Sequence, residues 1–214
     1  MPDSCVVIGC GGHSAAVISI IESIGLYHIV GLVDVAKTYN AEEQKSGYNV
    51  IFNLDELVNN ACNYRHLNCF IAVGDNYKRQ DVYSVLHDLG YKFPNIVANS
   101  AFVDRTVVMD EGNIIGHGVI INAQARLGSN NLINSRAVIE HHSTLKNHIH
   151  IAPGAVICGD VDISCFSFIG AGAVILPHIS VADKFTLGAG SVLVTNVKQS
   201  KETFVGIPGK GLIK

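Results

Sequence analysis

The sequence predicts two domains, an α/β domain over residues 1–95 and an all-β parallel β-helix over residues 96–214. Two patterns predict this division. The first part alternates short apolar runs with segments whose apolar residues recur at helical spacing. The second part carries an aliphatic residue at every sixth position from Val103 to Leu193. A six-residue period is the mark of a parallel β-helix built from hexapeptides.

The first segment, residues 4–34, has the pattern of a βαβ unit. A buried strand over 4–8 leads into a glycine turn at 9–13, and a helix over 14–25 leads to a strand that ends at Asp34. The pattern is Rossmann-like, but the turn lacks the third glycine of the dinucleotide motif, so a complete NAD site is not expected. The helix N-terminus can still meet a phosphate or a hydroxyl; a plain strand-to-helix turn is the alternative.

Further strands over 48–52 and 69–73 and helices over 53–61 and 77–89 complete the α/β domain. The carboxyl ends of parallel strands form the ligand-binding edge of such a sheet. We therefore expect the polar and glycine residues that follow three strand ends to converge and bind substrate. These residues are Gly11, Gly12, His13, Asp34, Gly74, Asp75 and Asn76.

In the β-helix, three hexapeptides complete one triangular coil, so residues 18 apart stack on neighbouring coils about 4.8 Å apart. The aliphatic positions fill the core, and we assign them no catalytic function. They are Val103, Met109, Ile115, Ile121, Leu127, Ile133, Ile139, Leu145, Ile151, Ile157, Ile163, Ile169, Ile175, Val181, Leu187 and Leu193.

The polar positions of the coils contain a cluster of histidines within residues 139–150. Gly159 follows His141 by 18 residues, so the stacking rule places it one coil above His141. A histidine beside a bare glycine N–H combines a base with an oxyanion donor. Surface histidines with ordinary hydrogen bonds are the alternative. Ala171 and Ala189 are also 18 apart and predict a smooth strip along which a narrow ligand can lie.

No metal site is expected, because no histidine has a recognised metal-ligand spacing. Adjacent histidines on extended chain point to opposite faces, so we expect that His141 and His142 do not chelate a metal together. The six cysteines are expected to be free thiols, since none forms a CxxC pair.

Composition sets further bounds on the function. A net charge of −3 gives no indication of nucleic-acid binding, and no apolar run is long enough to cross a membrane. The low charged fraction, 15%, indicates surfaces covered by oligomerisation. The first 25 residues do not have the pattern of a signal peptide, so a cytoplasmic location is expected.

A glycine turn ending in His13, coils containing Glu140-His141, and the closing segment Gly206-Ile207-Pro208-Gly209-Lys210 occur together here. This combination resembles a bacterial family of hexapeptide-repeat sugar acetyltransferases. The family comprises sialic-acid O-acetyltransferases and nucleotide-linked 4-amino-sugar N-acetyltransferases. The resemblance implies a left-handed β-helix, acetyl-CoA as co-substrate, and a homotrimer with acetyl-CoA in the cleft between neighbouring coils.

The resemblance also implies roles for individual residues. His141 matches the general base, and His150 matches a histidine near the acetyl thioester. Gly159 matches the glycine whose N–H faces the acetyl carbonyl. Ala171 and Ala189 match backbone positions along the pantetheine arm. The polar residues at the strand ends of the α/β domain match the nucleotide-sugar side.

Two residues depart from the family pattern. His142 stands where the family usually has a carboxylate beside the base, and Ala98 stands where sugar-binding relatives have histidine. Because a neutral histidine raises the pKa of the base less than a carboxylate does, three outcomes are open. The base is weaker, another carboxylate reaches His141, or the chain is less active or differently specific.

We interpret the chain as an acetyl-CoA-dependent N-acetyltransferase for a nucleotide-linked 4-amino-deoxysugar, with direct transfer and His141 as the base. The first alternative is O-acetylation of sialic acid or a related sugar. A non-catalytic nucleotide-sugar-binding protein is the alternative from another class, and a dehydrogenase built on the glycine turn is the minor one.

Overall fold

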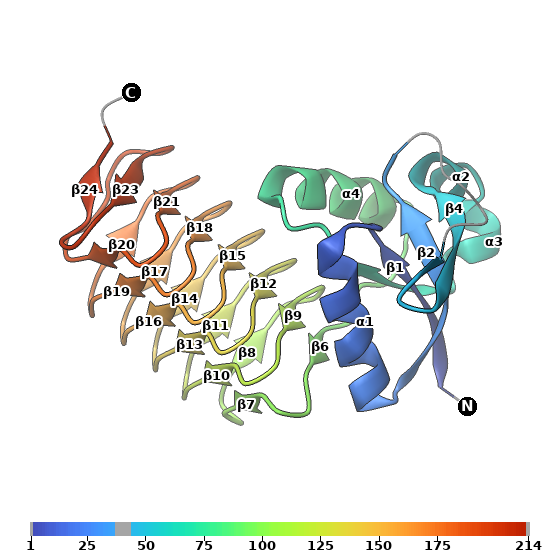
Figure 1. Ribbon diagram of the computed structural model, residues 1–214, viewed down its shortest axis with the longest axis horizontal. Helices are drawn as coiled ribbons and strands as arrows, with labels where there is room; N and C mark the ends of the chain where they lie inside the picture. Colours follow the sequence, from blue (N-terminus) through green and yellow to red (C-terminus); the bar gives the residue numbers. More distant parts are fainter. Residues whose placement is uncertain (1, 37–43, 213–214) are drawn as a thin grey trace. The chain divides into compact units, whose positions relative to one another are not determined.

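The computed structural model describes residues 2–36 and 44–212. The chain divides into two compact units, Met1–Asn99 and Ser100–Lys214 (Figure 1). The first is a Rossmann-like α/β domain and the second is a left-handed parallel β-helix, which confirms the predicted fold class. Within the described residues, no helix combines the length and the apolar character needed to cross a membrane.

The sheet of the first unit has the strand order β3-β4-β2-β1-β5. Strands β4, β2, β1 and β5 run parallel, and β3 forms an antiparallel pair with β4. The elements are β1 (Asp3–Ile8), α1 (Gly12–Ile24), β2 (Tyr27–Asp34), β3 (Gln44–Lys45), β4 (Tyr48–Asn53), α2 (Leu54–Asn59), α3 (Ala61–Tyr64), β5 (Asn68–Ile71), α4 (Asn76–Asp88) and β6 (Ile96–Val97).

Both faces of the central strand β1 are buried, which explains why its sequence is apolar without alternation. Val6 and Ile8 pack in one core with Leu57 of α2 and Leu86 of α4. Val7 points to the opposite face by strand alternation and is also fully buried. Such a strand belongs in the middle of a parallel sheet, where it places the following glycine turn at the sheet edge.

Two predicted elements differ from the structure. The helix expected over 53–61 ends at Asn59, because Asn60 has non-helical backbone angles and donates its side-chain amide to the carbonyl of Glu56 at 2.9 Å. A separate short helix, α3, begins at Ala61 and was not predicted. The strand expected over 69–73 ends at Ile71, where its partner strand β1 ends at Ile8.

The second unit winds its strands into three parallel sheets, one on each side of a triangular coil (Figure 1). From β7 to β22 the strand residues pair with residues 18 positions later, as Ile121 pairs with Ile139 and Ile139 with Ile157. The final pairing, of Thr186 with Thr203, is offset by 17 residues. The strand register predicted from the hexapeptide period is therefore confirmed. A short antiparallel pair, β23–β24, follows the last coil.

The strands of the second unit fall into three groups by sheet. The first sheet contains β7 (Phe102–Val103), β10 (Ile120–Ile121), β13 (Val138–Ile139), β16 (Val156–Ile157), β19 (Val174–Ile175) and β22 (Val192–Leu193). The second contains β8 (Val108–Met109), β11 (Arg126–Leu127), β14 (Thr144–Leu145), β17 (Asp162–Ile163) and β20 (Ser180–Val181). The third contains β9 (Ile114–Ile115), β12 (Leu132–Ile133), β15 (His150–Ile151), β18 (Phe168–Ile169), β21 (Thr186–Leu187), β23 (Thr203–Val205) and β24 (Lys210–Gly211).

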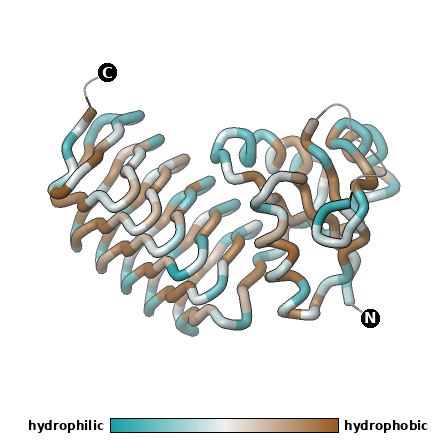
Figure 2. The backbone as a smooth tube through the Cα atoms, viewed as in Figure 1, coloured by the Kyte–Doolittle hydropathy of each residue, from teal (hydrophilic) through white to brown (hydrophobic). Residues whose placement is uncertain are grey.

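The core of the coils consists of the inward-facing aliphatic residues, and Figure 2 shows hydrophobic residues recurring along each coil. Ile139 and Ile157, for example, are fully buried. The cysteines are all free thiols, as predicted.

Candidate functional site

His141 and Gly159 occupy the same corner position on consecutive coils. Each follows a strand of the first sheet by two residues, and those strands, β13 and β16, are paired in register. The amide of Asp160 donates to the carbonyl oxygen of His141 at 3.1 Å. A Cβ atom built on Gly159 would lie 2.6 Å from Cε1 and 2.9 Å from Nε2 of His141. The imidazole therefore lies directly against the backbone of Gly159, in space that only glycine leaves open.

The amide of Gly159 is available for a ligand. Gly159 is buried, and within the described residues its N–H donates no hydrogen bond to the protein. His141 is exposed in the single chain. An exposed imidazole beside an unengaged, buried amide can take up a proton while the amide binds a developing negative charge.

His142 faces His141 in the structure. The Nδ1 atoms of the two rings are 3.0 Å apart, and the ring planes are nearly perpendicular. The prediction that these adjacent side chains point to opposite faces is wrong. His142 has a left-handed backbone with φ of 62°, so the alternation of an extended strand does not apply at this corner.

The nearby carboxylates have other partners. Glu140 accepts a hydrogen bond from the side-chain amide of Asn122 at 2.8 Å, and the carboxylate of Asp160 lies 3.5 Å from Nδ1 of His178. In the part of the chain that the structure describes, no hydrogen bond or ion pair links His141 to a carboxylate. The second of the three open outcomes, a carboxylate from elsewhere, is not observed among residues 2–36 and 44–212.

His150, Ala171 and Ala189 lie away from His141 within one chain. His150 is on the third sheet, where its ring packs edge-on against Phe168 at 5.1 Å. Ala171 and Ala189 are exposed and stacked at the corner between the third and first sheets. The amide of Gly190 donates to the carbonyl of Ala171 at 2.8 Å, as expected for neighbouring coils. Of the predicted cofactor residues, only Gly159 shares a corner with His141; His150 lies on a strand of the third sheet, and Ala171 and Ala189 lie at another corner.

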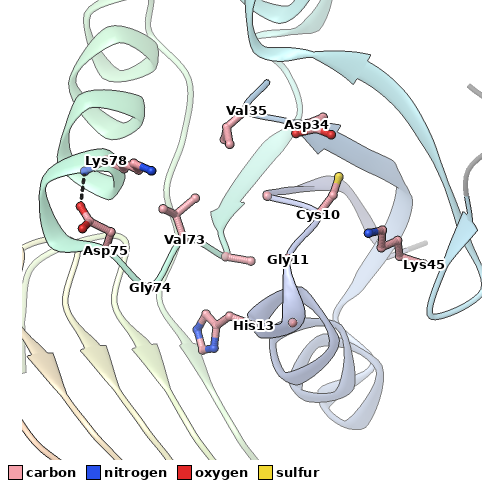
Figure 3. Close-up of a pocket in the computed structure, with 13 residues that line it drawn as sticks. Cys10, Gly11, His13, Asp34, Val35, Lys45, Val73, Gly74, Asp75 and Lys78 are labelled. Atoms are coloured by element: carbon pink, nitrogen blue, oxygen red, sulfur yellow. Dashed lines mark hydrogen bonds between the residues drawn. The ribbon is translucent and has the colours of Figure 1, made fainter. Parts of the chain in front are cut away.

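The first unit contains a pocket of about 530 Å³ at the carboxyl edge of its sheet (Figure 3). Six of the seven predicted substrate-binding residues line it: Gly11, Gly12, His13, Asp34, Gly74 and Asp75. Asn76 is buried instead and accepts a hydrogen bond from Arg79 at 2.7 Å. Lys45 and Lys78 also line the pocket, and the sequence analysis missed both. Their ammonium groups make the pocket suitable for an anionic ligand.

The glycine turn opens the N-terminus of α1 toward this pocket. Gly11 is the N-cap residue, with no side chain to bond the first amides of the helix. Gly9 has φ of 114°, and a Cβ atom there would lie 2.8 Å from the carbonyl oxygen of Ala72. The turn therefore requires glycine at position 9, and its geometry leaves helix amides for a phosphate or hydroxyl.

Arg79 stabilises, from inside the protein, the turn after β5 whose residues Val73 and Gly74 line the pocket. It is 1% exposed, and its guanidinium donates to the carbonyls of Val73 and Gly74 at 3.1 Å and 3.2 Å. Burial lowers the pKa of Arg79 to about 10, and the Asp75 carboxylate opposes that shift. The pKa of His13 is lowered by burial and by the charge of Arg79, so its ring is neutral at pH 7. Sequence analysis missed Arg79, although it lies at helical spacing with the buried Val82 and Leu86.

The comparisons with known proteins agree with this architecture. Residues 4–86 match the family model of the PglD N-terminal domain. The chain is similar to the acetyltransferase domain of PglB from Neisseria gonorrhoeae FA1090, with 27% identity, a TM-score of 0.90, and coverage of 98% of this chain and 100% of that one. It is also similar to PerB from Caulobacter crescentus in complex with CoA and GDP-perosamine, with 29% identity, a TM-score of 0.86, and coverage of 98% and 97%.

Over nearly its whole length the chain is therefore similar to sugar acetyltransferases of known structure, and residues 4–86 match the PglD N-terminal domain. WeeI from Acinetobacter baumannii AYE, at 18% identity, a TM-score of 0.82, and coverage of 98% of this chain and 100% of that one, has the same fold. A search of curated protein sequences gave no match.

The structure shows what surrounds His142 and Ala98, the two residues that depart from the family pattern. His142 contacts His141 directly through its ring nitrogen. Ala98 is buried, 1% exposed, and presents no polar side chain. Among the residues that the structure describes, no group of three or more histidine, cysteine or acidic side chains is arranged to hold a metal ion.

Proposed function

We propose that the protein transfers an acetyl group from acetyl-CoA to the amino group of a nucleotide-linked 4-amino-deoxysugar. The observation that carries the proposal is the imidazole of His141 lying against the backbone of Gly159, whose amide donates no hydrogen bond within the described residues. Two relatives support the substrate class. The PglB acetyltransferase domain has a solved structure in complex with acetyl coenzyme A, and PerB has one in complex with CoA and GDP-perosamine.

In the proposed reaction the sugar amine attacks the carbonyl carbon of the thioester. Nε2 of His141 accepts a proton from the amine, and the carbonyl oxygen becomes an oxyanion stabilised by the N–H of Gly159. Collapse of the tetrahedral intermediate expels the CoA thiolate, which takes the proton from the imidazolium. General-base catalysis and one oxyanion donor typically contribute about 10²–10⁴-fold and 10²–10³-fold to the rate.

The low reactivity of the Cys158 thiol supports direct transfer. Cys158 precedes Gly159 in the sequence, but burial and the Glu140 carboxylate raise its pKa above the ordinary value. A thiol with a raised pKa holds its proton at pH 7 and is a poor nucleophile. We therefore include no acetylated-cysteine intermediate in the mechanism.

The nucleotide end of the substrate is assigned to the pocket of the first unit. Lys45 and Lys78 supply positive charge for a diphosphate, and the open N-terminus of α1 supplies amides. Asp34 can accept hydrogen bonds from a base or a ribose. Its Oδ1 also accepts one from the amide of Ala36 at 2.9 Å. The proposed ligand is therefore anionic in its centre and has hydrogen-bond donors at one end.

A homotrimer is part of the proposal. Only the first sheet of the β-helix has outward-facing residues that are all apolar, in the part of the unit described here. They are Phe102, Ile120, Val138, Val156, Val174 and Val192. On the second sheet, the equivalent residues after Val108 are Arg126, Thr144, Asp162 and Ser180. A continuous apolar strip on one sheet is suited to subunit contacts, and neighbouring subunits can bring the corner of Ala171 and Ala189 to that of His141. Because acetyl-CoA is its donor substrate, we place the enzyme in the cytoplasm.

A panel assay tests the proposal. The protein is incubated with acetyl-CoA and a set of nucleotide-linked amino sugars, GDP-perosamine included, with free sialic acid as the O-acetylation control. We expect thiol release with at least one amino sugar, and mass spectrometry of the product should show one added acetyl group on nitrogen. Acetylation of sialic acid alone, or of no sugar, would contradict the proposed function. The oligomeric state is measured separately by light scattering, where a monomer would contradict the trimer.

A further inference from the structure

The contact between His141 and His142 defines how protons are placed on the two rings. A distance of 3.0 Å between the Nδ1 atoms is a hydrogen bond, and it requires one of the two nitrogens to carry a proton and the other a lone pair. If His142 donated, the neutral ring of His141 would carry its proton on Nε2 and could not act as a base there. If His141 donates, its Nε2 has the lone pair, and this nitrogen lies 2.9 Å from the place of a Cβ atom built on Gly159.

We propose that His142 is a positioning residue that accepts the Nδ1–H of His141 and so keeps the Nε2 of His141 unprotonated. This inference rests on the proposed role of His141 as the base. His142 then occupies the position of the family's carboxylate but carries no charge. Its own proton is then on Nε2, and the residue is exposed.

The exchange of a carboxylate for an imidazole changes the charge of the site. When His141 accepts the substrate proton, its Nδ1–H still donates to His142, but no negative charge balances the new cation. The remaining charged groups at this corner are Glu140, which is bonded to Asn122, and the pair of Asp160 and His178.

The backbone at residue 142 permits matched substitutions. Its φ of 62° favours asparagine and aspartate among the residues with side chains. Asparagine Oδ1 is separated from Cα by the same number of bonds as histidine Nδ1, so His142→Asn keeps an acceptor near the same place. His142→Phe keeps the ring but has no acceptor. Phenylalanine is compatible with such a corner, because Phe166 has φ of 63° in this same β-helix.

The test compares three variants of the full chain with the wild type in the acetyl-transfer assay over pH. We expect His142→Phe to lower kcat by about 10- to 100-fold, the range typical for loss of an orienting partner, with the KM for acetyl-CoA unchanged. His142→Asn should recover kcat to within about threefold of the wild type. His142→Asp should restore the charge and move the acid limb of the kcat profile upward by about one pH unit. Retention of more than half of kcat by His142→Phe, or an equal loss in His142→Asn and His142→Phe, would overturn the proposal.

A measurement without substrate separates this proposal from the proposed function. In the wild type with ¹⁵N-labelled histidine, NMR should show the proton of neutral His141 on Nδ1, whereas His142→Phe should show a mixture of both tautomers. Thermal unfolding of each variant verifies that the fold is kept. If no sugar is acetylated, the proposed function fails while the tautomer is still measured. A wild-type His141 with its proton on Nε2 would refute the positioning role alone.

Discussion

The close approach of His141 to Gly159 makes the substitution Gly159→Ala a sharp test of the site. The added methyl group would lie 2.6 Å from Cε1 of His141, which is about 0.8 Å inside the 3.4 Å at which ordinary van der Waals contact begins. The other nearby atoms are Nε2 and Nδ1 of the same ring, so the ring must move. A displacement of about 1 Å in a catalytic group can cost roughly 10²-fold in rate, and we expect a loss of that size in kcat/KM.

The same substitution should leave the stability of the fold intact. Gly159 does not have a positive φ, so alanine can adopt its backbone conformation. A Gly→Ala change at a compatible position typically stabilises a protein by about 0.4–1 kcal/mol through the unfolded state. Here the displaced His141 side chain is exposed and can move without leaving a cavity. The free energy of unfolding should therefore stay within about 1 kcal/mol of the wild type while activity falls.

The assay is thiol release from acetyl-CoA with the best amino-sugar substrate, for Gly159→Ala, His141→Asn and the double variant. If the methyl group lowers the rate by displacing the ring of His141, it should have little further effect once that ring is replaced by asparagine. The kcat/KM of the double variant should then resemble that of His141→Asn. Independent effects would instead multiply. A Gly159→Ala protein that keeps more than half of wild-type kcat/KM would refute the placement of the base.

Three further predictions concern the pocket of the first unit. Replacing Arg79 with Met leaves buried carbonyls without a donor and should lower the unfolding free energy by roughly 3 kcal/mol in urea titrations; a loss below 1 kcal/mol would contradict the bracing role. Because the pKa of His13 is lowered in the fold from 6.5, its neutral state contributes stability above pH 6.5 that is lost as pH falls through the folded pKa. His13→Gln should therefore flatten the dependence of the unfolding free energy on pH below 6.5, and an unchanged slope would speak against it. Asp75 caps α4 by accepting from the amides of Tyr77 and Lys78 at 3.0 Å and 2.9 Å, so Asp75→Ala should cost about 1 kcal/mol and Asp75→Asn only a few tenths in the same titration.

The β-helix could be predicted nearly residue by residue, because its period ties the sequence to the geometry. An aliphatic residue such as Ile139 can be buried in only one register of an 18-residue coil, and the strand pairs follow from that constraint. The contact of His141 with Gly159 is a consequence of the same register. The substrate-binding edge was predictable for a similar reason, since parallel strands deliver their carboxyl ends to one side.

The features that sequence analysis missed depend on local backbone angles or on side-chain reach. The left-handed corner at His142 turns its ring toward His141, whereas strand alternation predicted the opposite. Arg79 was not singled out, because a charged side chain on a helix is rarely buried; here it extends inward and donates to the carbonyl of Val73. Lys45 enters the pocket from the β3–β4 pair, which the sequence pattern did not identify.

A crystal structure of the enzyme with acetyl-CoA bound tests the central claim most directly. We predict that the thioester carbonyl oxygen lies about 2.7–3.1 Å from the amide nitrogen of Gly159, the reach of an oxyanion donor. The carbonyl carbon should be open to attack from the side of Nε2 of His141. An acetyl group bound at another corner of the prism, with its carbonyl out of reach of Gly159, would contradict this account of the site.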